Sequence, residues 1–174
     1  MKRRIRTRAA VSTLAGLVVA GTVTVGISVA SPEHEPSARH KPAAKAGEKQ
    51  IAALFDQWNA ALQTGDAEKV AERYAPDAVL LPTASPKIRT NHEEIADYFE
   101  HFLLKKPKGE KVRTVINVLD GNSAIDAGLY EFHITDPETG QKSTLQARYT
   151  FEYEKRDGKW LIVNHHSSVV PPAS

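Results

Sequence analysis

The segment Gln146–Ser168 decides the fold, and it has the sequence QARYTFEYEKRDGKWLIVNHHSS. Its first half alternates polar and apolar side chains from residue to residue, which is typical of a β-strand with one buried face. Asp157-Gly158 then predicts a turn, and a second apolar stretch starts at Trp160. The segment therefore predicts a β-hairpin with one face in a core.

The register of this hairpin depends on the length of its loop. A two-residue loop would place Tyr149 opposite His166, whereas a three-residue loop with Gly158 in the left-handed conformation places Tyr149 opposite His165. A slip of one residue turns a whole strand face outward, and only the three-residue loop keeps the apolar residues together. We therefore predict the three-residue loop. The shared face then contains Tyr149, Phe151, Tyr153, Leu161, Val163, His165 and Ser167.

Residues 1–30 are predicted to be a signal peptide. Five basic residues precede an uncharged run that ends in Ser28-Val29-Ala30, small residues of the kind that a signal peptidase accepts. An uncleaved membrane anchor is the alternative, because the run approaches the ~20 residues of a membrane span. Its content of Gly, Ser, Thr and Ala favours cleavage. We expect a secreted or extracytoplasmic protein, which touches the membrane only if the segment is retained.

Charge and composition exclude several classes of function. Without residues 1–30 the chain keeps 18 basic residues against 21 acidic ones, a net charge of −3, so nucleic-acid binding loses its support. The chain has no cysteine, which excludes disulfides and thiolate chemistry. It contains no phosphate-binding loop or dinucleotide fingerprint, and adjacent histidines on a strand diverge, so we expect neither a cofactor nor a metal.

The rest of the chain predicts one α+β domain. Residues 31–48 contain three prolines and no large apolar side chain, and we expect a disordered linker there. Within residues 49–171, helical periodicity comes first and alternation follows, so helices should cover one face of an antiparallel sheet. We expect a helix at 49–64, a short second helix that Asp66 caps and that carries Tyr74, and a third helix that Asn91 caps and that ends at Leu104. Strands are expected at 77–82, 111–119, 123–134, 143–153 and 160–169.

Several motifs resemble nuclear transport factor 2-like domains: Trp58–Leu62 with Gly65-Asp66, Tyr74–Val79, and Arg89–Asn91. The ending Asp157–Ser168 is similar to the SnoaL-like SgcJ/EcaC-type group, which is allied to the association domain of calcium/calmodulin-dependent protein kinase II. The resemblance covers Lys49 to about Pro171. It implies a cone of three helices around a curved, mainly antiparallel sheet, a pocket at the open end, and dimers formed through the sheet.

A pocket in such a fold would be lined by the helices and the apolar sheet face. The predicted ligand-binding residues are Trp58, Arg89, Tyr98, Phe102, Tyr149, Phe151, His165 and Ser167. His165 is the candidate general base, since only histidine titrates near neutrality without help; the alternative is a structural histidine that hydrogen-bonds Tyr149 or the backbone. Arg89 could hold an anion bidentately or simply tie its loop to the next helix.

Two functions remain open. The first is an exported domain that binds a small organic ligand, anionic or phenolic, by stacking on Trp58 and hydrogen bonds to His165 and Arg89, with weak isomerase- or hydrolase-like chemistry left open. The second is a non-catalytic homo-oligomerisation module. In either case Arg148, Glu152 and His166 point outward, and we expect them at the interface of a homodimer.

Overall fold

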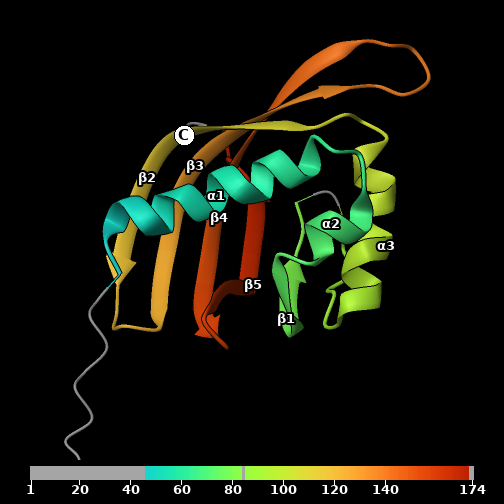
Figure 1. Cartoon of the computed structure of the whole chain (residues 1–174). Coiled ribbons are helices and arrows are strands. Elements are labelled where there is room, and N and C mark those ends of the chain that lie inside the picture. The colour runs from blue at the N-terminus through green and yellow to red at the C-terminus, as the bar shows by residue number, and fades with distance from the viewer. Residues whose placement is uncertain (1–45, 84, 173–174) are drawn as a thin grey trace, which may run out of the picture. The chain divides into compact units, whose positions relative to one another are not determined.

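The computed structural model describes residues 46–83 and 85–172. The predicted signal peptide, and the predicted linker as far as residue 45, lie outside the described residues. Within them the chain forms three helices and five strands (Figure 1). In chain order the elements are α1 (Glu48–Leu62), α2 (Ala67–Ala71), β1 (Tyr74–Leu81), α3 (His92–Leu103), β2 (Lys108–Val118), β3 (Ser123–Thr135), β4 (Lys142–Arg156) and β5 (Lys159–Val169).

The five strands form one sheet in the order β1-β5-β4-β3-β2. All neighbouring strands are antiparallel except β1, which runs parallel to β5. Helix α1 crosses one face of the sheet, and β3 and β4 continue beyond it as a long hairpin (Figure 1). This arrangement confirms the predicted fold class, which is three helices packed on a mainly antiparallel sheet.

The helix ends follow from local hydrogen bonding. The Asp66 carboxylate accepts hydrogen bonds from the first backbone amides of α2, and the Asn91 side chain accepts one from the Glu94 amide at the start of α3. Glu94 in turn accepts a hydrogen bond from the Thr90 amide. Both caps were predicted from the sequence. The strand expected at residue 77 begins earlier, at Tyr74.

The predicted register of the β4–β5 hairpin is wrong. Asp157 and Gly158 both have positive φ, 50° and 81°, so they form the two-residue turn that the twist of a hairpin favours. Arg156 therefore pairs with Lys159, while farther along Tyr149 lies opposite Ser167 and Phe151 lies opposite His165. The three-residue loop and the Tyr149–His165 pair do not form.

A β-bulge reconciles this short turn with the buried aromatic face. Tyr153 pairs with Ile162 but Glu152 pairs with Asn164, so Val163 is an extra residue on β5. Before the bulge the buried residues of β5 are Trp160 and Ile162, and after it they are His165 and Ser167. Leu161 and Val163, which we predicted on the core face, are only partly buried, and Ile162, predicted outward, is in the core.

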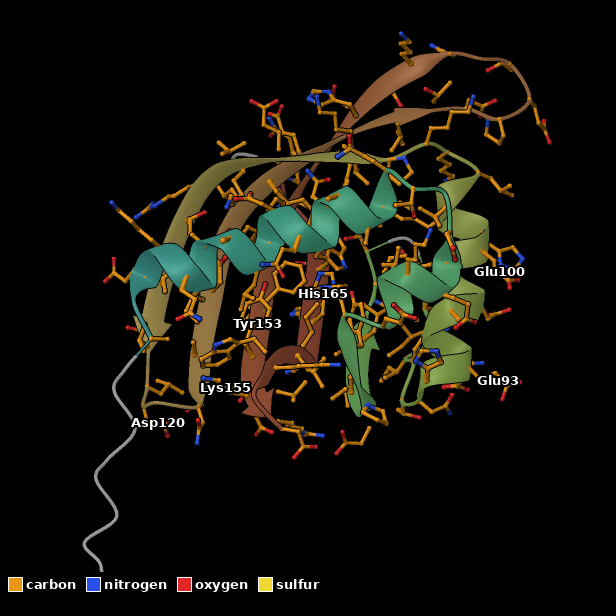
Figure 2. The ribbon with its side chains drawn as sticks, in the orientation of Figure 1. Glu93, Glu100, Asp120, Tyr153, Lys155 and His165 are labelled. Carbon is orange, nitrogen blue, oxygen red and sulfur yellow. The ribbon has the colours of Figure 1, made fainter. Side chains whose placement is uncertain are left out.

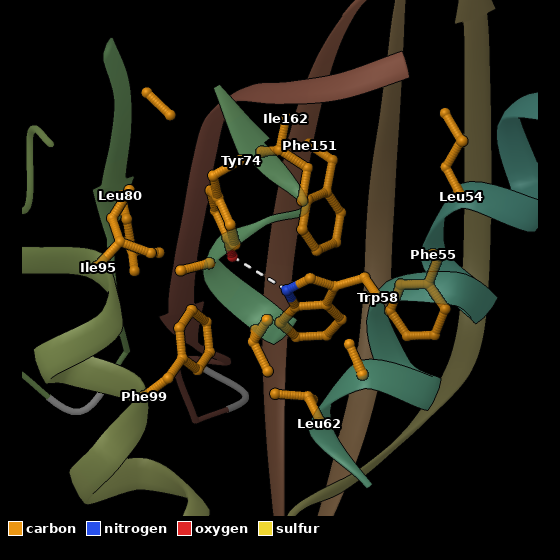
Figure 3. Close-up of a cluster of buried hydrophobic side chains, with 14 of the residues drawn as sticks. Leu54, Phe55, Trp58, Leu62, Tyr74, Leu80, Ile95, Phe99, Phe151 and Ile162 are labelled. Atoms are coloured by element: carbon orange, nitrogen blue, oxygen red, sulfur yellow. Dashed lines mark hydrogen bonds between the residues drawn. The ribbon is translucent and has the colours of Figure 1, made fainter. Parts of the chain in front are cut away.

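Trp58 lies near the centre of the core. It is 1% exposed, and the centroids of five neighbouring rings lie within 6.4 Å of its own. These rings are Phe55, Phe99, Phe132, Phe151 and His165. Figure 3 shows the indole nitrogen hydrogen-bonded to the Tyr74 hydroxyl. Burial of an aromatic side chain of this size stabilises a fold by roughly 2–3 kcal/mol.

The β2–β3 pair depends on a close backbone approach at Gly128. A Cβ atom there would lie 1.8 Å from the Arg113 carbonyl oxygen, next to the register shift of β2. Only glycine allows this approach. In residues 46–83 and 85–172, no helix is long and apolar enough to span a membrane.

Candidate functional site

A small cavity of about 20 Å³ lies where α3, the end of β1, and strands β3–β5 meet. A cavity of this volume has room for about one water molecule. Its walls are mainly aromatic and aliphatic, with a few polar groups. The lining residues are Trp58, Leu80, Pro82, Thr83, Tyr98, Phe99, Phe102, Tyr130, Phe132, Leu145, His165 and Ser167.

His165 is one of the polar residues that line this cavity. Its position is labelled in Figure 2. The Tyr74 hydroxyl lies 3.0 Å from Trp58 Nε1 and 2.8 Å from His165 Nδ1. Because the indole N–H can only donate, the Tyr74 oxygen accepts from Trp58, and its single hydrogen is available to His165 Nδ1. Because Nδ1 accepts this hydrogen bond, the proton of neutral His165 is on Nε2. That nitrogen is buried and has no hydrogen-bond partner among the described residues.

Burial fixes the protonation state of His165. The side chain is 3% exposed, with its ring stacked 4.0 Å from that of Phe151. Desolvation, with a further contribution from the nearby His166, lowers the pKa of His165 from 6.5 to about 3. His165 is therefore neutral near pH 7 and is a weak base there, because a general base works best with a pKa near the working pH. It is better suited to donate a hydrogen bond from Nε2.

Three hydroxyl groups, those of Thr83, Tyr130 and Ser167, form a second polar part of the cavity wall. The Tyr130 hydroxyl donates to Ser167 Oγ at 2.6 Å, and Thr83 Oγ1 is also hydrogen-bonded to Ser167. Burial raises the pKa of Tyr130 above its ordinary value, so the phenol stays protonated and remains a donor. His165 and Ser167 lie two residues apart on β5, so both polar groups are on the same strand face.

The cavity brings together five of the predicted ligand-binding residues. These are Trp58, Tyr98, Phe102, His165 and Ser167. Phe151 does not line the cavity: it is fully buried in the core, and its ring stacks on that of His165. Trp58 is enclosed by neighbouring rings, so the predicted stacking of a ligand on its face would require those rings to move.

Tyr149 lies away from the cavity, beside a buried carboxyl group. Its hydroxyl is 3.0 Å from Asp126 Oδ1 and 3.0 Å from Thr114 Oγ1. Asp126 is fully buried, and its Oδ2 has no partner among the described residues. Burial raises the pKa of Asp126, and the hydrogen bond from Tyr149 opposes this shift. Sequence analysis missed Asp126, although its place in the alternation of β3 could have indicated an inward carboxyl.

Arg89 also lies apart from the cavity. It lines a surface hollow of about 330 Å³ together with Tyr98 and Phe102, whose other sides face the cavity. The two aromatic rings stack on each other with centroids 5.7 Å apart. The predicted single pocket that joins Arg89 to His165 is therefore divided by this stacked pair.

Tyr74, Tyr130 and Thr83 were also missed by sequence analysis. Tyr74 was placed on the second helix, whereas it starts β1 and reaches His165. Tyr130 lies on the inward phase of β3, a signal that the alternation of Ser123–Thr135 contains. In the described part of the chain, no group of three or more His, Cys, Asp or Glu residues could hold a metal ion.

Comparisons with known proteins agree with this architecture. A family model, the calcium/calmodulin dependent protein kinase II association domain, matches residues 47–171. A search of curated proteins gave no match. A crystal structure from Xanthomonas campestris, whose protein carries the name of the same association domain, is 57% identical, with a TM-score of 0.71 over 75% of this chain and 96% of that chain.

More distant structures share the fold. A nuclear transport factor 2-like superfamily protein from Salmonella enterica is 17% identical with a TM-score of 0.63, over 72% of this chain and 92% of its own. A ketosteroid isomerase-like protein from Erwinia carotovora atroseptica is 19% identical with a TM-score of 0.59, over 70% and 95%. The long family match and the 57% identity show that this chain belongs to the calcium/calmodulin-dependent protein kinase II association domain family.

Proposed function

We propose that the chain is a small-molecule-binding domain, and that the cavity beside His165 is its binding site. The observation that carries this proposal is that His165 lines the cavity and that its buried Nε2–H has no hydrogen-bond partner among the described residues. A buried donor without an acceptor costs about 1–3 kcal/mol, a cost that a bound acceptor would remove. A purely structural core could place an apolar side chain at this position at no such cost.

The geometry favours a neutral ligand that carries a hydrogen-bond acceptor, such as a carbonyl oxygen. The polar residues of the lining are His165 and the hydroxyl-bearing Thr83, Tyr98, Tyr130 and Ser167, and among the described residues no charged side chain lines the cavity. The present volume of about 20 Å³ fits little more than a water molecule. A larger ligand would therefore have to displace Tyr98 and Phe102, the stacked pair that separates the cavity from the surface hollow.

Binding, rather than a reaction, is what these residues support. The low pKa of His165 makes proton abstraction at neutral pH unfavourable. The only fully buried carboxyl among the described residues, Asp126, does not line the cavity. Some relatives of this fold carry enzyme-like names, such as the ketosteroid isomerase-like protein, but that name applies to the relative. We assign no reaction to this chain.

A ligand screen with matched variants tests the proposal. Neutral carbonyl compounds of increasing size are added to the intact chain, and the unfolding temperature is measured. We expect at least one compound to raise it in the wild type and in His166→Gln, whose side chain is exposed, but not in His165→Phe, which keeps a ring against Phe151. Equal shifts in His165→Phe, or no shift with any compound together with no co-purified small molecule, would contradict the proposal.

A second candidate function, homo-oligomerisation, is favoured by the outer face of the sheet. Val115, Thr150 and His166 lie in one row across the strands, and Val115 is 52% exposed. Arg148 and Glu152 flank this row on β4, two residues to either side of Thr150. If two copies stacked face to face about a two-fold axis parallel to this row, Arg148 of one copy would lie near Glu152 of the other, which makes the face self-complementary. The family name of the chain is consistent with such an assembly.

We further propose that the domain acts outside the cytoplasm. The support is the basic start of the sequence followed by an uncharged run to Ala30. Intact-mass measurement of protein from the native host should give a chain that begins near Ser31, in a soluble extracytoplasmic fraction. A chain that retains Met1 and sediments with membranes would instead support an anchor.

A further inference from the structure

The surface hollow beside Arg89 contains an incompletely paired, buried cation. Arg89 is 7% exposed. Its backbone is fixed by two hydrogen bonds to Leu80, an isolated β-bridge that holds the loop before α3 against β1. Burial of a charge is unfavourable unless the charge is paired and its hydrogen bonds are satisfied. The partners of the guanidinium group therefore decide whether Arg89 has a purely structural role.

Only one side of the guanidinium group is well occupied. Nη1 donates to the Lys87 carbonyl oxygen at 2.8 Å and lies 3.4 Å from Ser85 Oγ. Nη2 forms an ion pair with Asp97 at 3.9 Å, which is too long for a hydrogen bond, and the Asp97 side chain is 55% exposed. Nε is buried without any partner among the described residues. The two parallel donors of the Nε–Nη2 edge therefore have no acceptor within hydrogen-bond distance among the described residues.

The surroundings suit an oxyanion. A guanidinium edge binds two oxygens of one carboxylate or phosphate in parallel. The hollow of about 330 Å³ also contains Lys105, and the only carboxylate among its lining residues is Asp97, so positive charge predominates. The Arg89 Cζ atom lies 5.7 Å from the centroid of the Tyr98 ring, which holds the plane of the guanidinium group over an aromatic surface.

We propose that this hollow is an oxyanion-binding site, with the Nε–Nη2 edge of Arg89 as the bidentate donor and Lys105 as a second positive charge. The ligand is a free inorganic oxyanion or the carboxylate of a small organic acid, and both offer the same pair of oxygens. The proposed oxyanion site does not rest on the proposed function of the cavity beside His165, although Tyr98 and Phe102 line both and a ligand that displaced them would also change the hollow.

Thermal unfolding of the intact chain tests the site, with sodium phosphate, sodium sulfate and sodium benzoate as probes and sodium chloride at equal ionic strength as the reference. We expect the oxyanions to raise the unfolding temperature above the chloride value in a saturable manner. Phosphate and sulfate as the stronger probes would identify an inorganic ligand, whereas benzoate as the stronger one would identify an organic acid that also contacts Tyr98.

Three variants locate the effect. Arg89→Lys keeps the charge and removes the fork, and should weaken binding about tenfold or more. Lys105→Ala leaves the contacts of Arg89 intact and should weaken binding several-fold, so it tests the site even if Arg89→Lys fails to fold. Lys87→Ala is the matched control, because Lys87 Nζ pairs with Glu94 rather than lining the hollow. Binding no stronger than chloride, or equal in the wild type and Lys105→Ala, would overturn the proposal.

Discussion

Replacement of His165 by phenylalanine should make the stability of the domain less sensitive to acid. The pKa of His165 is lowered by burial to about 3 in the fold, against 6.5 for an ordinary histidine. The unfolded chain therefore binds a proton at this residue between these two values, whereas the folded chain does not. The sign follows directly: the contribution of neutral His165 to stability is complete above pH 6.5 and is lost as the pH falls toward 3.

The size of the loss follows from the same two values. One proton bound only by the unfolded state changes the free energy of unfolding by about 1.4 kcal/mol per pH unit. Between pH 7 and pH 4.5, protonation of His165 in the unfolded chain should therefore lower the free energy of unfolding of the wild type by about 2–3 kcal/mol. With an m-value of about 1–3 kcal/mol/M, this corresponds to a fall of about 1–3 M in the urea midpoint.

The assay is urea unfolding of the wild type and His165→Phe at pH 7, 6, 5 and 4.5. His165→Phe loses the hydrogen bond from Tyr74, so its stability at pH 7 can differ in either direction, and only the pH dependence is diagnostic. His101→Gln serves as the control, because it removes a histidine whose side chain is exposed rather than buried. Parallel losses in the wild type and His165→Phe would refute the buried, neutral histidine.

Three further substitutions test other parts of the structure. Asp126→Asn should raise the urea midpoint at pH 7, because burial raises the pKa of Asp126 and the wild type loses stability as the pH rises through that pKa. The gain in midpoint should vanish near pH 3, and a gain that persists at pH 3 would contradict this explanation. Gly128→Ala should destabilise the fold by about 3 kcal/mol or more in the same assay, since its Cβ would meet the Arg113 carbonyl, while Gly47→Ala, with open space around it at the N-cap of α1, should cost no more than about 1 kcal/mol. Arg148→Glu should weaken the proposed dimer in light scattering and the added exchange Glu152→Arg should restore it; a monomeric wild type at micromolar concentration would exclude that dimer.

The elements of the fold could be predicted because their signals are local. The caps at Asp66 and Asn91 and the alternation of the long strands each depend on a few neighbouring residues, and the structure contains them all. Long-range contacts behave differently. Tyr74 and His165 lie 91 residues apart in the chain, and nothing in the sequence around Tyr74 indicates that its hydroxyl ends at that imidazole. The separation of Arg89 from the cavity could not be predicted either, because it depends on how the rings of Tyr98 and Phe102 stack in the folded chain.

The error in the hairpin register shows a limit of periodicity. The inference that the aromatic face of β4 must meet the apolar face of β5 was sound, and a regular hairpin could satisfy it only with a three-residue loop. The chain satisfies it with a two-residue turn and an extra residue at Val163. A bulge changes the phase of a strand without any change in local composition, so alternation alone cannot locate it.

The bulge is also what selects His165 over its neighbour. In an unbroken strand the inward phase of Trp160 and Ile162 would continue to Asn164 and His166, and His165 would face outward. Strand β1 shifts its register at the same height, between its pairs Tyr74–Ile162 and Val79–Asn164. Two neighbouring strands are thus irregular where the hydrogen bond between Tyr74 and His165 is made. Bulges commonly redirect side chains at functional sites. The interruption of the sheet at His165 therefore supports a role for this residue in the cavity beyond packing.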